Sequence, residues 1–521
     1  LYWVAISMSK TIIIIGAGLA GLSAALQAAE NGCNVKLVSS LPSERAQSVM
    51  AEGGINAALN TKDENDSPEE HFTDTIKAAC GLADPNAVWG MTQAAPELVH
   101  WLLKLGVKFN MSGYDDVDLR NFGGQKKKRT AFAQSDTGKQ IMTAMIDAVR
   151  RKEASGMVER FSHHSFLTLR LCGNICCGCV IRDEYSQETV ELPGDAVIVA
   201  TGGMHGLFGN TTGSLSNTGE VTAELFRLGV PLANGEMIQY HPTTVKCGGK
   251  RMLISEAARG EGGRLFAMKD GKQWYFMEEK YPELGNLMPR DITAREIWKV
   301  SHESEVFLDM TEISEEIISN KLSGLADDCM TYLHKDIRKE PVSVLPGIHY
   351  FMGGILVDEQ HRTPIQNLYA AGECCAQYHG ANRLGGNSLL GALYGGRVAA
   401  KSACEQADAV DLSCATQIDF PPASQISEIK QLNKVMQETM GVVRNENTLL
   451  NGIQTVQALT GNLPLLGMAV LKSALARKES RGAHWREDYP KSNDDDYLKT
   501  TVARFDGKQI QISFVPVPER R

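Results

Sequence analysis

Polar residues able to do chemistry recur between positions 241 and 383, beside glycine, proline or other small residues. They are His241, Ser255, Glu256, Arg259, Arg290, His349 and Arg383. Such neighbours are typical of loops at the edge of a cleft. Arginine offers a planar fork that pairs bidentately with a carboxylate, and histidine adds a further donor. Three arginines and two histidines in one cleft would suit a substrate with two carboxylates, although each residue alone also fits a surface charge or a structural ion pair.

A glycine-rich turn lies near the start of the chain. In TIIIIGAGLAGLSAALQAA, four isoleucines typical of a buried strand precede Gly16, Gly18 and Gly21 in G-x-G-x-x-G spacing. A helical pattern and a second apolar strand follow, ending near Ser39. In this context the glycines allow a tight turn and close approach to a pyrophosphate at the helix N-terminus, so we expect a dinucleotide site rather than a merely glycine-rich helix start.

Two later segments support the same nucleotide-binding domain. AVIVATGGMHGLF is a buried strand running into Thr201-Gly202, and NLYAAGE places another strand before Gly372-Glu373, with a helix from about Asn387. Flavoproteins with two dinucleotide-binding domains combine all three features, whereas a nicotinamide enzyme rarely does. The sequence therefore predicts an α/β protein with a Rossmann-type FAD-binding domain.

Composition divides the chain into parts. The nucleotide-type segments occupy residues 8–236 and 351–412, and a different pattern at 237–350 predicts an inserted α+β capping domain that carries substrate residues. Residues 413–521 are predicted to form a C-terminal helical domain and tail, because ISEIKQLNKVMQETMGVV and LLNGIQTVQALTGNLPLL show helical apolar spacing. The stretch ESRGAHWREDYPKSNDDDY is polar and predicts a loop.

Bulk properties exclude several classes of protein. The net charge of −9 argues against general nucleic-acid binding, and no run is predicted to span a membrane. The twelve cysteines are scattered and predict reduced thiols in a cytoplasmic setting. Their densest group, Cys172, Cys176, Cys177 and Cys179, fits a hairpin with buried cysteines better than a metal or redox site, and no metal is predicted. The basic run at 126–129 is expected on a solvated face, with anion attraction as the alternative.

Nine ordered motifs carry a family resemblance across residues 9–490. They are GAGLAGL, AEGG, ATGG, QYHPT, EAARGEGG, PRD, HYFMGG, HGANRLGGNSL and ESRGAHWRED. Together they resemble the flavoprotein subunit of fumarate reductase and succinate dehydrogenase, a family that also includes L-aspartate oxidase. The resemblance implies reduction of fumarate to succinate, with a hydride from the flavin N5 and a proton from Arg290.

The resemblance also implies roles for the polar residues. His349 and Arg383 resemble the pair that binds one substrate carboxylate, and His241 with Ser255 resembles the pair that binds the other. Relatives often have threonine where Ser255 stands. Arg290 of PRD resembles the proton donor, and Glu256 with Arg259 resembles a relay to solvent. The implied FAD contacts are Gly16, Ala17, Gly18, Gly21, Ser39, Gly53, Gly54, Thr201, Gly202, Glu220, Glu373, Ser388 and Leu389.

Several positions depart from the patterns of relatives. Ser39 ends the second strand where an acid often binds the ribose, and Gly219-Glu220-Val221 replaces Gly-Asp-Gly, so a ribose contact from Glu220 is an expectation only. Phe122 stands where aspartate oxidases carry a glutamate for the substrate amino group, which favours a plain dicarboxylate. Gln47 stands where membrane-bound respiratory members carry a histidine bonded to the flavin, which predicts non-covalent FAD and favours fumarate reduction.

Partners follow from the same resemblance. The sequence shows no cluster or haem motif, so we expect an iron–sulfur electron-transfer subunit, and contact with a membrane only through partners. The predicted location is the cytoplasm. The alternatives are L-aspartate oxidase, and a non-catalytic flavin subunit of an electron-transfer assembly; the retention of Arg290, His349 and Arg383 together argues against the latter.

Overall fold

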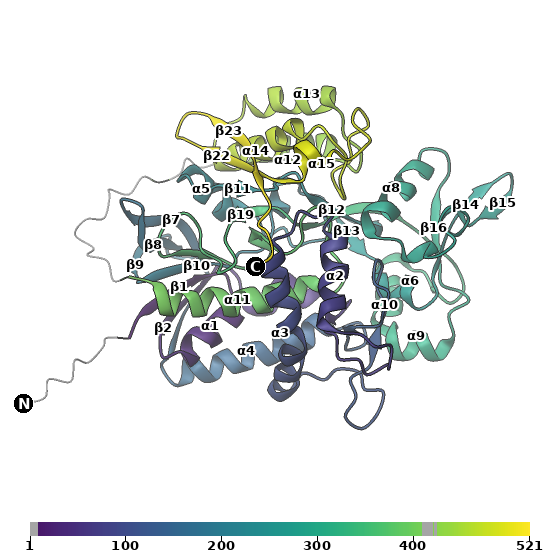
Figure 1. Cartoon of the computed structure of the whole chain (residues 1–521), viewed down its shortest axis with the longest axis horizontal. Coiled ribbons are helices and arrows are strands. Elements are labelled where there is room, and N and C mark those ends of the chain that lie inside the picture. The colour runs from purple at the N-terminus through teal and green to yellow at the C-terminus, as the bar shows by residue number, and fades with distance from the viewer. Residues whose placement is uncertain (1–8, 409–419, 421–424) are drawn as a thin grey trace, which may run out of the picture.

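The computed structural model describes residues 9–408, 420 and 425–521. Figure 1 shows a central α/β body, a region of strands and short helices on one side, and the C-terminal region above. The central sheet is parallel, with strand order β20-β10-β1-β2-β6. The bounds of these strands are Leu368–Ala370, Ala196–Val199, Thr11–Ile15, Asn34–Ser39 and Val158–Ser162.

Alternate isoleucines of β1 explain the two covered faces of the sheet. Ile12 and Ile14 pack into one core with helices, and Ile13 and Ile15 pack into another with a small antiparallel sheet. The helices are α1 (Leu19–Glu30), α3 (Pro85–Leu105), α4 (Thr137–Ala154) and α11 (Asn387–Gln406). The small sheet consists of β7 (His164–Cys172), β8 (Ile175–Asp183) and β9 (Thr189–Pro193). A doubly covered parallel sheet explains why β1 is apolar throughout.

The region between β11 (Leu232–Ala233) and β19 (Gly354–Leu356) has its own core and mixes strands with helices. One sheet has the order β13-β12-β18, and another has the order β15-β14-β16-β17. The strand bounds in these orders are Lys250–Leu253, Ile238–Cys247, Leu345–Phe351, Lys272–Trp274, Arg264–Lys269, Val306–Asp309 and Val342–Ser343. The helices that bear on the site are α6 (Glu256–Gly260), α8 (Arg290–Val300) and α10 (Ser323–Asp328).

The C-terminal region is not purely helical, which corrects the prediction of a helical domain with a loop-like tail. After α12 (Ile426–Thr439), α13 (Glu446–Val456) and α14 (Asn462–Ala476), a short helix α15 (Asp494–Tyr497) leads into two strands. These are β22 (Lys499–Phe505) and β23 (Ile510–Pro516), which extend a sheet of order β21-β19-β11-β22-β23. The reason is alternation in β23, where Ile510, Ile512 and Phe514 are half-buried while Gln511 and Ser513 are exposed.

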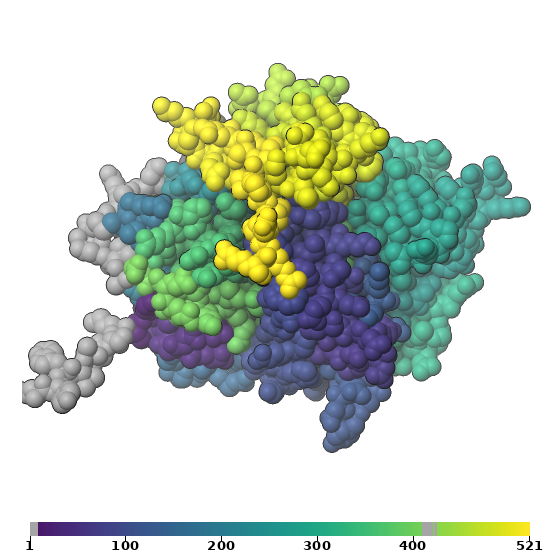
Figure 2. Space-filling model, in the orientation of Figure 1, coloured from purple at the N-terminus to yellow at the C-terminus, as the bar shows by residue number. Residues whose placement is uncertain are grey.

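The last residues of the chain lie against the central body. Figure 2 shows them crossing its surface, where Asn86 of α3 donates to the carbonyl of Glu519 at 3.0 Å and Arg520 lies 3.8 Å from the ring of Trp89. No helix among the described residues is long and apolar enough to span a membrane.

The cysteine hairpin forms as predicted, because β7 pairs antiparallel with β8 and Cys176, Cys177 and Cys179 are fully buried. The described residues contain no group of three or more potential ligands that could hold a metal. The expectation of reduced thiols is wrong at Cys172, which is in a disulfide. Ten other cysteines in the described part of the chain are free.

The basic run at 126–129 does not lie wholly on a solvated face. Lys126 and Lys128 are exposed, but Arg129 is fully buried and forms 2.9 Å ion pairs with Asp66 and Asp74. A buried arginine needs such partners to offset its lost hydration. The expectation therefore fails at Arg129, because its acids come from a distant segment.

Candidate active site

A cavity of about 950 Å³ runs from the glycine-rich turn to the strands and helices of the 237–350 region. It brings together residues that are far apart in the sequence. Of the predicted site residues, Gly21 and Arg259 do not line it. The others do: Gly16, Ala17, Gly18, Ser39, Gly53, Gly54, Phe122, Thr201, Gly202, Glu220, His241, Ser255, Glu256, Arg290, His349, Glu373, Arg383, Ser388 and Leu389.

The glycine-rich turn has the geometry that its sequence predicts. Gly16 has φ of +111°, and a Cβ there would lie 2.2 Å from the carbonyl oxygen of Ala200. Gly18 caps the N-terminus of α1, which opens into the cavity. A Cβ on Gly21 would lie 1.8 Å from the carbonyl oxygen of Gly16, so this glycine allows the helix to pack on the turn rather than facing the cavity.

The lining residues fit FAD. The N-terminus of α1 and that of α11, through Ser388 and Leu389, both border the cavity, and helix N-termini favour phosphate and other anionic groups. Ser39 ends β2 with its Oγ buried and without a hydrogen-bond partner among the described residues, as expected where a bound molecule supplies one. Glu373 accepts from the backbone N–H of Phe351 at 3.1 Å, which fixes this acid at the cavity wall.

A buried arginine holds the Glu52-Gly53-Gly54 loop in place through the backbone carbonyls of the loop. Arg120 donates from Nε to the carbonyl of Gly53 at 3.0 Å and from Nη2 to that of Glu52 at 3.1 Å. A Cβ on Gly53 would lie 2.7 Å from the ring of Phe122, and Gly54 has φ of +134°. Both glycines are therefore required by the protein's own packing, and contact of this loop with the flavin remains a prediction.

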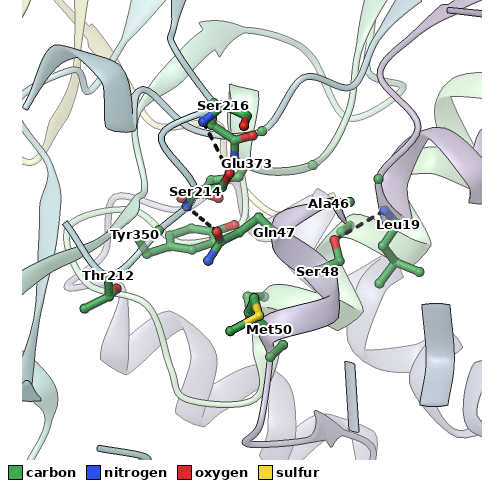
Figure 3. Close-up of a pocket in the computed structure, with 18 of the residues that line it drawn as sticks. Leu19, Ala46, Gln47, Ser48, Met50, Thr212, Ser214, Ser216, Tyr350 and Glu373 are labelled. Atoms are coloured by element: carbon green, nitrogen blue, oxygen red, sulfur yellow. Dashed lines mark hydrogen bonds between the residues drawn. The ribbon is translucent and has the colours of Figure 1, made fainter. Parts of the chain in front are cut away.

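Gln47 lies at the start of the short helix η2 (Gln47–Met50), which borders the cavity. Figure 3 shows its side chain beside Ser214, whose backbone N–H donates to Gln47 Oε1. The next residue, Ser48, accepts from the backbone N–H of Leu19 at 3.3 Å and so ties η2 to the first turn of α1. Position 47 is thus held beside the nucleotide-binding turn.

Glu256 joins two buried arginines into one ion-paired group. Arg290 donates from Nε to Glu256 Oε2 at 2.8 Å, and Arg259 Nη2 lies 3.2 Å from Glu256 Oε1. The backbone N–H of Gly123 also donates to Oε1, at 3.0 Å. Burial raises the pKa of Glu256, but the two arginines outweigh it and hold that pKa below its ordinary value. The carboxylate is therefore ionised and ion-paired with both Arg290, the predicted proton donor, and Arg259, its predicted partner in the relay.

The predicted carboxylate-binding histidines face each other. The rings of His241 and His349 are 5.1 Å apart and perpendicular, with His349 Nδ1 2.8 Å from the hydroxyl of Thr212 and His241 Nδ1 3.1 Å from the carbonyl of Thr243. Burial, reinforced by Arg290, lowers the pKa of both histidines well below the ordinary value. Both rings are consequently neutral at pH 7.

Arg383 lacks an acid of its own. Its guanidinium lies 4.2 Å from the ring centroid of Tyr350, and its Nε is buried with no hydrogen-bond partner among the described residues. Burial and the neighbouring Arg290 lower its pKa to about 9, so it remains charged at neutral pH. An unpaired buried cation that lines a cavity is a strong site for a ligand carboxylate.

Sequence reasoning missed four residues that shape this site. Gln239 accepts from Arg290 Nη1 at 3.1 Å and donates to the carbonyl of Arg383 at 2.8 Å. The other three are described above: Tyr350 contacts Arg383, Thr212 contacts His349, and Arg120 donates to the Gly53 carbonyl. Gln239 and Tyr350 lie in the motifs QYHPT and HYFMGG, so their place in these motifs could have identified them as site residues.

Comparison with known proteins agrees with this geometry. The family models described as FAD binding domain and fumarate reductase flavoprotein C-term match residues 11–389 and 459–520. The succinate dehydrogenase flavoprotein subunit of Bacillus subtilis (strain 168) is 38% identical over 98% of both chains. The 8-methylmenaquinol:fumarate reductase flavoprotein subunit of Wolinella succinogenes is 32% identical over 98% of this chain and 92% of that one.

Solved structures show the same likeness. A structure of Escherichia coli quinol fumarate reductase matches with a TM-score of 0.89 and 27% identity, over 98% of this chain and 97% of that one. The protein is thus an FAD-dependent oxidoreductase that belongs to the succinate dehydrogenase and fumarate reductase flavoprotein family.

Proposed function

We propose that this protein reduces fumarate to succinate as the flavoprotein subunit of a larger complex. The observation that carries the proposal is a group of three buried arginines beside the cavity that contains a single ion-paired acid, Glu256. Arg290, Arg259 and Arg383 lie close together, and Glu256 is the acid that ion-pairs with two of them while Arg383 has none. A dianionic substrate would complete this charge balance.

Two pairs of residues would bind the substrate carboxylates. His349 with Arg383 is suited to one carboxylate, and His241 with Ser255 to the other, since all four side chains line the cavity. Neutral histidines donate without adding a charge that would repel the arginines. Donors placed on the developing charge polarise the alkene, and one such donor is typically worth about 3–4 kcal/mol of barrier.

Reduction adds a hydride and a proton to the two alkene carbons. FAD, held by the residues around the glycine-rich turn, supplies the hydride when it is bound and reduced. Arg290 would deliver the proton from its guanidinium, because it is the arginine that both lines the cavity and bonds Glu256. Arginine is a poor acid at neutral pH, so Glu256 must resupply the proton. Arg259, which is ion-paired with Glu256, would connect this carboxylate to solvent.

Phe122 supports a plain dicarboxylate rather than aspartate. Its side chain is 2% exposed and lines the cavity against Gly53, where a phenyl ring cannot ion-pair with a substrate ammonium group as a carboxylate does. L-Aspartate oxidation remains the second candidate, because the glutamine at position 47 agrees with either reaction.

Gln47 supports non-covalent attachment of the flavin. A carboxamide cannot form the bond that a histidine forms with the flavin methyl group, and Gln47 Oε1 is already bonded to the backbone of Ser214. Acid precipitation should therefore release FAD into the supernatant. A yellow, fluorescent protein pellet would contradict this attachment.

An external electron donor completes the proposal. The relatives are described as flavoprotein subunits, which supports a partner, and an iron–sulfur subunit is the class that we propose. We place the protein at the cytoplasmic face of a membrane only through such partners.

One assay separates the candidates. Purified holoenzyme is given reduced viologen and fumarate, and in parallel L-aspartate, succinate with a dye acceptor, or no substrate. Fumarate-dependent viologen oxidation is expected. Aspartate oxidation without fumarate reduction would favour the second candidate, and activity with none of the substrates would favour a non-catalytic subunit. The succinate arm measures the preferred direction.

A further inference from the structure

Residues 477–486 contribute to the active site although none of them lines the cavity. The stretch follows α14, and Arg477, Glu479, Arg481 and His484 are each no more than 8% exposed. The stretch from Glu479 is a polar loop, as predicted, but several of its charged side chains are buried. The segment contacts three parts of the chain that carry predicted substrate-site residues.

The first contact is with the turn before β12. Arg477 donates from Nε to Glu236 Oε1 at 2.8 Å, and Arg444 donates from Nη1 both to the carbonyl of Glu236 at 2.7 Å and to His484 Nδ1 at 2.9 Å. Glu236 precedes His241 by five residues along the same stretch. The buried charges therefore fix the start of the strand that carries His241.

The second contact is with the loop that carries Arg383. The backbone N–H of Ala483 donates to the carbonyl of Ala381 at 2.9 Å. Gly482 has φ of +54°, and a Cβ there would lie 2.5 Å from the same carbonyl oxygen. Ala381 precedes Arg383 by two residues, so any side chain at position 482 would displace this loop.

The third contact is with α8, the helix that begins at Arg290. The guanidinium of Arg295 lies 4.1 Å from the ring centroid of Trp485, which orients the helix against the segment. Inside the site, Gln239 is bonded to both Arg290 and the carbonyl of Arg383. The segment thus contacts, from outside the cavity, the same parts of the chain that Gln239 joins within the site.

We propose that residues 477–486 are a positioning element that sets the distance between the two carboxylate-binding ends of the active site. Buried arginines that bond every guanidinium nitrogen, as Arg477 and Arg481 do, are held rigidly, and rigidity is what a site needs to select a dicarboxylate by its length. This inference rests on the proposed function, because it concerns the binding of a four-carbon dicarboxylate.

The sharpest test is Gly482→Ala in the holoenzyme, matched with Gly507→Ala. Gly507 has φ of +89°, so alanine is strained there as well, but its Cβ would meet nothing within 4 Å. We expect Gly482→Ala to raise KM for fumarate about tenfold, because displacements near 1 Å have large kinetic costs. FAD content should stay unchanged, and Gly507→Ala should leave KM unchanged.

Calorimetry with succinate and glutarate gives a second readout that a general loss of folding would not produce. Wild-type holoenzyme should prefer the four-carbon succinate over the five-carbon glutarate, and Gly482→Ala should reduce that preference. Equal preference in the wild type and Gly482→Ala would overturn the positioning role.

Arg477→Lys provides an independent test if Gly482→Ala does not fold. Lysine keeps the charge but loses the fork that bonds Glu236, Glu479 and the carbonyls of Tyr497 and Lys499. The control is Arg129→Lys, because Arg129 is equally buried but pairs with Asp66 and Asp74 and does not line the cavity. We expect a higher KM and a weaker four-carbon preference only in Arg477→Lys.

The outcomes separate this inference from the proposed function. A wild type that neither reduces fumarate nor binds succinate would overturn both. A wild type that binds succinate, with Arg477→Lys and Arg129→Lys showing the same KM, would overturn only the positioning role.

Discussion

Two groups of buried arginines in this protein are partnered in opposite ways. In the C-terminal region, Arg477, Arg481 and Arg486 direct every guanidinium nitrogen at a carboxylate, carbonyl or hydroxyl oxygen. In the active site, Arg383 lies on the ring of Tyr350 and leaves its buried Nε unbonded among the described residues. The guanidinium nitrogens of the first group all have hydrogen-bond partners, whereas Nε of Arg383 has none among the described residues.

The pKa values follow this difference. Burial lowers the pKa of Arg481, but hydrogen bonds with Glu479 and Asp494 outweigh it and raise that pKa above the ordinary value. For Arg383, burial and the like charge of Arg290 act together and lower the pKa to about 9. A buried cation with all its hydrogen bonds made therefore indicates a structural role. A buried cation without them, beside a cavity, indicates a binding site.

The largest expected effect is on Arg290, the arginine that joins both roles. Arg290→Ala removes the proposed proton donor and should lower the rate of fumarate reduction by about 1,000-fold or more, within the upper range for proton transfer by a positioned side chain. Stopped-flow oxidation of the reduced holoenzyme measures it, with flavin absorbance checking that FAD stays bound. Arg264→Ala is the control, because Arg264 pairs with Glu278 outside the cavity. Residual turnover above one tenth would contradict the donor role.

Arg383→Met tests the unsatisfied arginine directly. Losing a charged donor to a substrate carboxylate should raise KM for fumarate about 30-fold or more, since such a contact is typically worth about 2 kcal/mol or more. Because this cation is buried without an acid, the apoprotein should also become more stable, by about 1 kcal/mol. Steady-state kinetics and thermal unfolding measure the two effects. A loss of stability would show that Arg383 is structural.

Arg486→Met tests a satisfied arginine and should behave in the opposite way. It leaves the carbonyls of Ala474 and Leu475 without their donor, whereas Asp488 is exposed and can be hydrated, so we expect a local loss of about 1–3 kcal/mol. Hydrogen exchange of the amides near residues 477–489 measures this opening free energy. KM for fumarate should change far less than in Arg383→Met, and a raised KM with unchanged exchange would break the comparison.

Glu52→Gln extends the comparison to an acid and has the smallest expected effect. Glu52 borders the cavity with Oε2 unbonded among the described residues, and burial with Asp328 raises its pKa to about 8, while Arg120 opposes this. Between the ordinary glutamate pKa of 4.5 and this raised pKa of about 8, the folded state keeps a proton that the unfolded state releases, so stability falls as pH rises.

Removing the carboxyl should therefore flatten the dependence of stability on pH. Thermal unfolding at pH 5 and pH 8 should show a smaller difference in Glu52→Gln than in the wild type. Glu44→Gln is the control, because Glu44 is an exposed glutamate paired with Arg150. Parallel curves for the wild type and Glu52→Gln would contradict the shift.

Much of the cavity was predictable from short-range patterns. The four isoleucines and the spacing of Gly16, Gly18 and Gly21 are local rules of strand, turn and helix, and the structure forms them as predicted. The motifs around His241, Arg290 and Arg383 named residues that the fold does bring into one cavity. Their roles, and the exact domain boundaries, stay predictions.

Buried charge was not predictable in the same way. Arg129 was predicted on a solvated face, and Arg477 precedes a stretch that the sequence marks only as a polar loop. Their acids are Asp66 and Asp74 in one case and Glu236 and Glu479 in the other, and most of these lie far away in the sequence. Periodicity records which residues avoid water, but it cannot record which distant charge will neutralise an arginine.

The sequence by itself thus determined the nucleotide-binding turn, the α/β class and the residue types of the active site, because these depend on neighbours within a few positions. Only the tertiary structure decided which arginines are satisfied and which await a ligand. It also joined residues 477–486 to the elements that carry His241, Arg290 and Arg383. The physical reason is that the cost of burying a charge is settled by partners that only the complete fold brings together.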